Sequence, residues 1–235
     1  MEGKKGLGHI EMILSFVLFA GFLIFGLYFF NPINNDRVLD SSSEYAYDEI
    51  IDNTTTTMIG YSVVVGENVP NGAIKIELDR GEADGNGIRI ENYTENTKPF
   101  DEANGLVIDR AGDNFLRIDF GDFVSNKGAF KASTSTPLVL GSDFFVSSSD
   151  TKRIVTELRL EKLNASYYSD YLGLKQRFNL PNRVDFGFTV DMGDRKIKSV
   201  NEIPAGIEVF SKSERIEILR KNGKVEYADL VVSVW

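Results

Sequence analysis

A long apolar run near the start of the chain constrains its fold more than any other feature. Residues Met12–Phe30 are almost wholly apolar and carry no charged side chain. A helix over this run would extend for about 28 Å at 1.5 Å per residue, close to the roughly 30 Å hydrocarbon core of a bilayer. The run predicts a transmembrane or assembly helix over residues 7–31, with the lipid bilayer as its surroundings.

The residues before the run predict an orientation. Lys4 and Lys5 precede it, and short flanks rich in Lys and Arg tend to stay in the cytoplasm. We therefore expect a single-pass protein of the plasma membrane, with a cytoplasmic leader over residues 1–6 and an extracellular C-terminal domain. A removable secretory signal is not favoured, because the run is too long and no small-residue cleavage site follows it.

The residues at the start of the apolar run resemble a known processing motif. The segment Lys4-Lys5-Gly6-Leu7-Gly8-His9-Ile10-Glu11 resembles the processing motif of archaeal type IV pilin-like proteins with a class III signal peptide. The resemblance implies that a prepilin-type peptidase cuts after Gly6. Leu7 is then the first mature residue and Glu11 the fifth. Many archaeal members have Gln at the first mature position and Ser or Thr at the third, where this chain has Leu7 and His9.

The same resemblance implies a function for Glu11. In the family this carboxylate pairs with the free amine of a neighbouring subunit, here that of Leu7, when like subunits assemble through their N-terminal helices. We therefore expect a membrane-anchored, externally exposed type IV pilin-like structural subunit, major or minor, on the membrane or in a surface filament after processing. The alternative is an uncleaved, signal-anchored surface module that binds a ligand, a glycan or a protein partner.

Composition excludes several other classes of function. The net charge of −9 over 235 residues argues against nucleic acid as a partner, because nucleic-acid binding needs a basic face. The chain has no cysteine, so its fold cannot rely on disulfides. Its single histidine, His9, lies at the start of the apolar run, which leaves the rest of the chain without Ser-His-Asp or His-metal chemistry. We expect no enzyme, no cofactor and no metal site.

The remainder of the chain predicts an α+β protein with a β-rich outer domain. Val38, Leu39, Ala46, Ile50 and Ile51 recur near helical spacing, which predicts an amphipathic helical stalk within residues 32–57. From residue 58 the apolar period changes to two, and turn residues separate the short alternating segments. This pattern is typical of an antiparallel sandwich, here over residues 58–235.

Individual segments of that domain give sharper expectations. The alternation over Ile154–Leu163 predicts a strand, and Tyr167–Asn179 predicts a helix that ends before Pro181. The pair Asn222-Gly223 predicts a two-residue hairpin. Gly81–Gly87 reads as a hairpin loop whose acids either stay solvated or hold calcium weakly.

Two further sets of residues are candidates for chemistry. Four acids alternate with strand residues and predict the polar face of a hairpin around Gly112-Asp113, with a glycosidase-like carboxylate pair as the alternative: Asp109, Asp113, Asp119 and Asp122. Three Asn-x-Ser/Thr triplets place candidate N-glycosylation sites at Asn53, Asn92 and Asn164.

Overall fold

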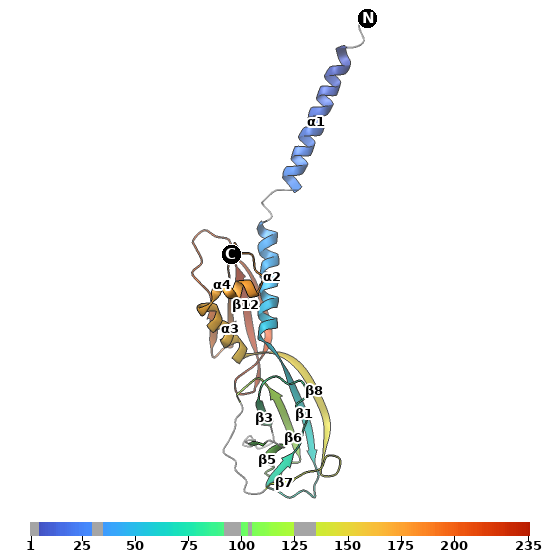
Figure 1. The fold of residues 1–235 in the computed structure, drawn as a ribbon, viewed down its shortest axis with the longest axis vertical. Coiled ribbons are helices and arrows are strands. Elements are labelled where there is room, and N and C mark those ends of the chain that lie inside the picture. The colour runs from blue at the N-terminus through green and yellow to red at the C-terminus, as the bar shows by residue number, and fades with distance from the viewer. Residues whose placement is uncertain (1–4, 30–34, 92–99, 103–104, 125–134) are drawn as a thin grey trace.

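The chain forms an isolated N-terminal helix followed by an elongated body that is rich in strands (Figure 1). The computed structural model describes residues 5–29, 35–91, 100–102, 105–124 and 135–235, with the side chains of the first helix described from Glu11 to Gly26. The helices are α1 (Lys5–Phe29), α2 (Asn35–Thr54), α3 (Glu157–Ser169) and α4 (Tyr171–Arg177). Helix α2 lies within residues 32–57, where the sequence predicts a helical stalk.

An eight-stranded sheet runs through the body in the order β10-β9-β12-β11-β8-β1-β6-β3. Its neighbours pair antiparallel, except for a short parallel contact between β11 and β8 at Ile218 and Leu219. In chain order its members are β1 (Thr55–Val65), β3 (Gly87–Glu91), β6 (Phe115–Gly121), β8 (Phe144–Thr156), β9 (Phe186–Asp191), β10 (Lys196–Ser199), β11 (Phe210–Leu219) and β12 (Val225–Val234).

A second, four-stranded sheet covers one end of the large sheet. Its order is β4-β5-β2-β7, and its members are β2 (Ala73–Ile76), β4 (Phe100–Glu102), β5 (Gly105–Asp109) and β7 (Thr136–Pro137). The two sheets enclose a core of alternating aliphatic and aromatic residues, among them Val63, Ile74, Ile108, Ile118 and Phe144. This half of the body is therefore a β-sandwich, as the period of two predicts.

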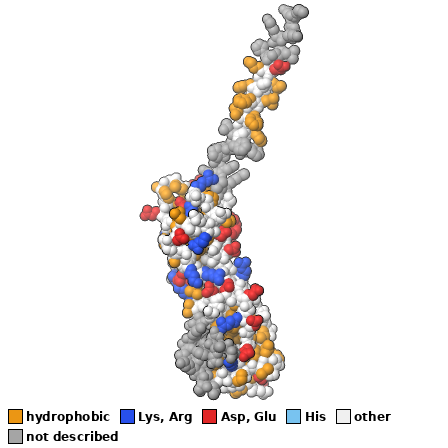
Figure 2. Space-filling model, viewed as in Figure 1, with side chains coloured by type: hydrophobic (Ala, Val, Ile, Leu, Met, Phe, Trp, Pro, Cys, Tyr) orange, Lys and Arg blue, Asp and Glu red, His pale blue; other side chains and the backbone are white. Residues whose placement is uncertain are grey.

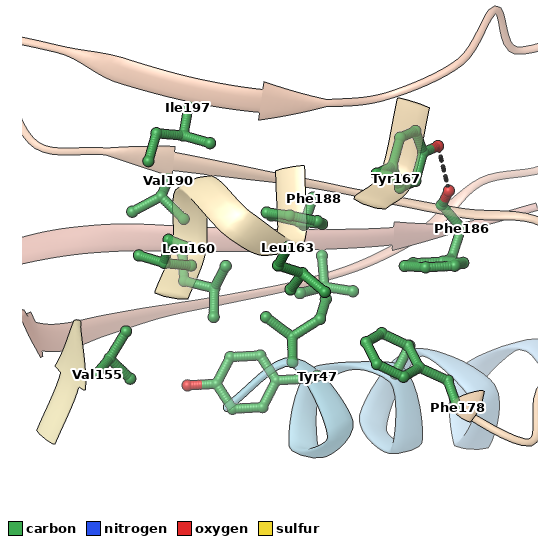
Figure 3. Close-up of a cluster of buried hydrophobic side chains, with 14 of the residues drawn as sticks. Tyr47, Val155, Leu160, Leu163, Tyr167, Phe178, Phe186, Phe188, Val190 and Ile197 are labelled. Carbon is green, nitrogen blue, oxygen red and sulfur yellow. Dashed lines mark hydrogen bonds between the residues drawn. The ribbon is translucent and has the colours of Figure 1, made fainter. Parts of the chain in front are cut away.

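The other half packs helices on the large sheet, as Figure 3 shows. Leu160, Leu163 and Tyr167 of α3 point toward Phe188 and Val190 of β9, with Tyr47 of α2 on the opposite side of the cluster. The buried Tyr167 hydroxyl donates a hydrogen bond of 2.6 Å to the Phe186 carbonyl, so this phenol is satisfied inside the core. Burial raises the pKa of Tyr167 to about 12.

The strand predicted over Ile154–Leu163 is wrong beyond Thr156. Leu160, Leu163 and Tyr167 are the buried residues of α3, and their spacing of three and four is helical. Thr156 caps the helix, since its hydroxyl accepts a hydrogen bond of 3.2 Å from the Arg159 amide. The cap residue ends the strand although the apolar alternation continues past it.

The two acidic loops do not close hairpins, but the Asn222-Gly223 turn does. Gly81–Gly87 leads from β2 in the small sheet to β3 in the large one, and the turn at Gly112-Asp113 leads from β5 to β6 in the same way. By contrast, β11 and β12 pair antiparallel on either side of Asn222-Gly223, so a hairpin forms there. Its loop has three residues and not the predicted two, because Arg220 and Lys224 are the last hydrogen-bonded pair and only Gly223 of the loop takes a positive φ, of 80°.

Candidate functional site: the exposed N-terminal helix

Helix α1 presents an apolar surface that the body leaves uncovered. Its eleven large apolar side chains from Met12 to Phe25 are between 48% and 73% exposed. In Figures 1 and 2 the helix stands clear of the body and is joined to it through α2. With side chains of this size, the exposed apolar area is on the order of 1,000 Å², above the roughly 300–600 Å² of the largest patch on an ordinary monomer.

The predicted membrane span needs correction. In the part of the chain that the structure describes, no helix is both long and apolar enough to cross a membrane. The predicted fold class with a transmembrane helix is therefore wrong for the described residues. The single-pass plasma-membrane localisation and the extracellular placement that depended on that helix are not supported either.

The residues predicted for processing, Gly6 and Leu7, and for assembly, Glu11, lie in the first turns of α1. Gly6 and Leu7 are helical in their backbone, and the Leu7 side chain lies outside the described residues. Glu11 is exposed, and it is the one charged side chain between Glu11 and Gly26. Leu7 and Glu11 are four residues apart, so the two positions share one face of the helix, one turn apart.

Helix α2 is packed against the body through buried side chains. Ala46, Tyr47 and Ile50 are buried against the large sheet. The Tyr47 hydroxyl donates a hydrogen bond of 2.9 Å to Glu214 of β11, and Lys212 lies 4.2 Å from the Tyr47 ring centroid. Burial, followed by the hydrogen bond to Glu214, raises the pKa of Tyr47 above its ordinary value.

The three glycosylation candidates lie in different surroundings. Asn53 is exposed in the last turn of α2, where its amide donates a hydrogen bond of 2.7 Å to the Glu49 carbonyl. Asn164 is half-buried in α3, and its side-chain oxygen accepts a hydrogen bond of 2.6 Å from Ser199. Asn92 lies outside the described residues. Glycosylation at these positions stays a prediction, with Asn53 the more accessible of the two described sites.

The acids considered for glycosidase chemistry are bound by structural partners. Asp119 is buried on the large sheet and forms ion pairs of 3.0 Å with Arg89 and 2.8 Å with Arg117. Asp122 binds Arg159 at 3.2 Å, whereas a side-chain oxygen of Asp109 accepts from the backbone amide of Ala111. Their carboxylates therefore support the fold, and the predicted hairpin face does not form.

The sequence analysis did not identify one buried glutamate, Glu157. Glu157, in the first turn of α3, is 4% exposed. It accepts hydrogen bonds from Arg195 at 3.0 Å, from Arg220 at 3.1 Å and from the Lys221 amide at 3.0 Å. These contacts join α3 to the loop before β10 and to the β11–β12 turn. The one local signal in the sequence is the position of Glu157 directly after a capping Thr.

Among the residues that the structure describes, no group of three or more His, Cys, Asp or Glu side chains is arranged to hold a metal ion. The remaining candidate is thus the apolar surface of α1 with Glu11 near its start. In the comparisons with known proteins, no family model, no curated protein and no solved structure matches this chain.

Proposed function

We propose that this protein is a type IV pilin-like structural subunit that assembles with like subunits through α1. The observation that carries the proposal is the apolar surface of α1, which stays exposed among the residues that the structure describes. Helices that are apolar on all sides are buried in their working state, because leaving such a surface in water is costly. Packing of α1 against α1 of other copies supplies that burial, and the resemblance of residues 4–11 to a pilin processing motif points to the same partner.

Glu11 has a defined role in this proposal. Inside a bundle of apolar helices a lone carboxylate is strongly unfavourable, since few groups there can offset its charge. Cleavage after Gly6 would create an amine at Leu7, and that amine on a neighbouring copy would supply the missing positive charge. The carboxylate then sets the register between two helices, in addition to the apolar contacts that hold them together.

The test compares Glu11→Gln with the wild-type chain in cells that express it. Loss of one partner from a buried ion pair costs about 3–5 kcal/mol, which lowers the association constant by more than about 100-fold. The variant should therefore fold but remain unassembled when cell extracts are sized by sedimentation. Glu67→Gln, at an exposed acid on the body, is the matched control and should assemble as the wild type does.

Mass spectrometry of the same material gives an independent result. The proposal expects a mature N-terminus at Leu7. Wild-type assembly of Glu11→Gln would contradict the role of Glu11. A wild-type chain that is monomeric at every concentration would contradict the assembly itself.

A further inference from the structure

Asn-Gly pairs are the points in a protein chain where an asparagine side chain deamidates most readily. Glycine has no Cβ, so its amide nitrogen can approach the side-chain carbonyl carbon of the preceding asparagine with little steric hindrance. The chain holds four such pairs: Asn71-Gly72, Asn86-Gly87, Asn104-Gly105 and Asn222-Gly223. Asn104 lies outside the described residues, and the structure distinguishes the other three asparagines.

The hydrogen bonds of the β11–β12 turn restrain Asn222. The Gly223 amide, which would have to attack the side chain, donates a hydrogen bond of 2.9 Å to the Arg220 carbonyl. The side-chain oxygen of Asn222 accepts a hydrogen bond of 2.9 Å from the Lys224 amide. Both hydrogen bonds oppose the movement that brings the attacking nitrogen to the side-chain carbon.

Strand pairing restrains Asn86 in a different way. Gly87 is buried as the first residue of β3, where it pairs with Gly121 of β6. A Cβ at Gly87 would lie 2.5 Å from the carbonyl oxygens of Gly121 and Phe123, so these backbones pack closely against it. The Gly87 amide therefore cannot turn toward the Asn86 side chain unless this end of the strand leaves the sheet.

Neither restraint acts on Asn71. This residue is exposed in the segment 66–72, which joins β1 to β2 at the end of the body away from α1 (Figure 1). Gly72 is half-buried and takes a positive φ of 113°. Its carbonyl accepts a hydrogen bond of 3.0 Å from the Arg110 amide, but its own amide donates to no acceptor among the described residues. The attacking nitrogen is thus free, and the side chain that it attacks is open to water.

We propose that Asn71 is a site of spontaneous deamidation in the folded protein, ahead of Asn86 and Asn222. The Gly72 amide nitrogen loses its proton and bonds to the side-chain carbonyl carbon of Asn71. The bond from that carbon to the side-chain nitrogen breaks, and ammonia leaves. Water then opens the resulting succinimide at either carbonyl, which gives aspartate or isoaspartate. Both products place a new negative charge beside the turn at Gly112, and isoaspartate also lengthens the main chain directly before β2.

Peptide mapping by mass spectrometry tests the proposal on the folded full chain, whether or not the chain assembles. The chain is held at mildly alkaline pH, which favours the deprotonated amide, and samples are digested at successive times. Conversion at Asn71 should be at least about tenfold faster than at Asn222, because two hydrogen bonds oppose the reaction there. Asn71→Gln is the matched variant, and it should show no conversion at this position because the larger ring closes slowly.

The same chain unfolded in guanidinium chloride is the control for the role of the fold. Without the turn and the sheet, Asn71, Asn86 and Asn222 should convert at similar rates. Conversion at Asn86 or Asn222 that is as fast as at Asn71 in the folded chain would overturn the proposal. An equal preference for Asn71 in the unfolded chain would show that the neighbouring residues set the rates, and it would overturn the proposal as well.

Discussion

Replacing Glu157 by Gln should destabilise the body measurably. The substitution keeps the size of the side chain but removes the charge that Arg195 and Arg220 bind, and it leaves two guanidinium groups facing an amide. Breaking a buried ion pair costs about 3–5 kcal/mol in general. Here Arg220 keeps Asp194 and Glu226, and the half-exposed Arg195 keeps Glu161, so the expected loss is about 2–3 kcal/mol.

Scanning calorimetry of the full chain measures this loss. For a chain of this size, 1 kcal/mol corresponds to about 2–4 °C, so the melting temperature should fall by about 5–10 °C. Glu208→Gln, at an exposed acid, is the matched control and should change the stability by no more than about 0.5 kcal/mol. If Glu157→Gln melts within about 2 °C of the wild type, the ion-pair network contributes little and the reasoning is refuted.

Two further predictions concern the large sheet. A Cβ at Gly60 would lie 1.9 Å from a guanidinium nitrogen of Arg117, so Gly60→Ala should displace that side chain and lower the unfolding free energy by about 1–3 kcal/mol; an unchanged denaturation midpoint would argue against the contact. The hydrogen bond donated by Tyr47 lowers the pKa of Glu214 below its ordinary value, so Glu214 stabilises the folded state above about pH 4.3 and loses this effect as the pH falls through its folded pKa. The melting temperature should therefore fall in acid, and it should fall less steeply for Glu214→Gln.

The sequence alone predicts the elements whose signals are local. The period of two indicated the strand-rich part of the chain, and Asn222-Gly223 identified the hairpin of β11 and β12, where Gly223 takes a positive φ. The sequence-based prediction of a strand failed beyond Thr156, because the apolar alternation of the strand continues into helix α3. The prediction of hairpins at the two acidic loops also failed. These loops connect the two sheets, and the pairing of strands that are distant in the sequence cannot be predicted from the residues of the loop.

The sequence likewise predicts some features of the candidate site and not others. The apolar run and Glu11 are visible in the sequence, because composition and spacing alone define them. The membrane span was an inference from the length of the run that the described helix does not support. A pocket on the body is lined by residues from almost the whole length of the chain, among them Leu39, Ile207 and Trp235, so no local pattern could have predicted it.

The central claim is that α1 packs against α1 of another copy, and in-cell cross-linking at Phe19 tests it most directly. Phe19 is 61% exposed in the middle of the apolar stretch, so a photo-activatable phenylalanine analogue fits there with little change. With a second, differently tagged copy in the same cell, the account predicts that the probe captures α1 peptides of that second copy. A probe that captures no peptide of a second copy, while the chain is present at wild-type levels, would contradict the account.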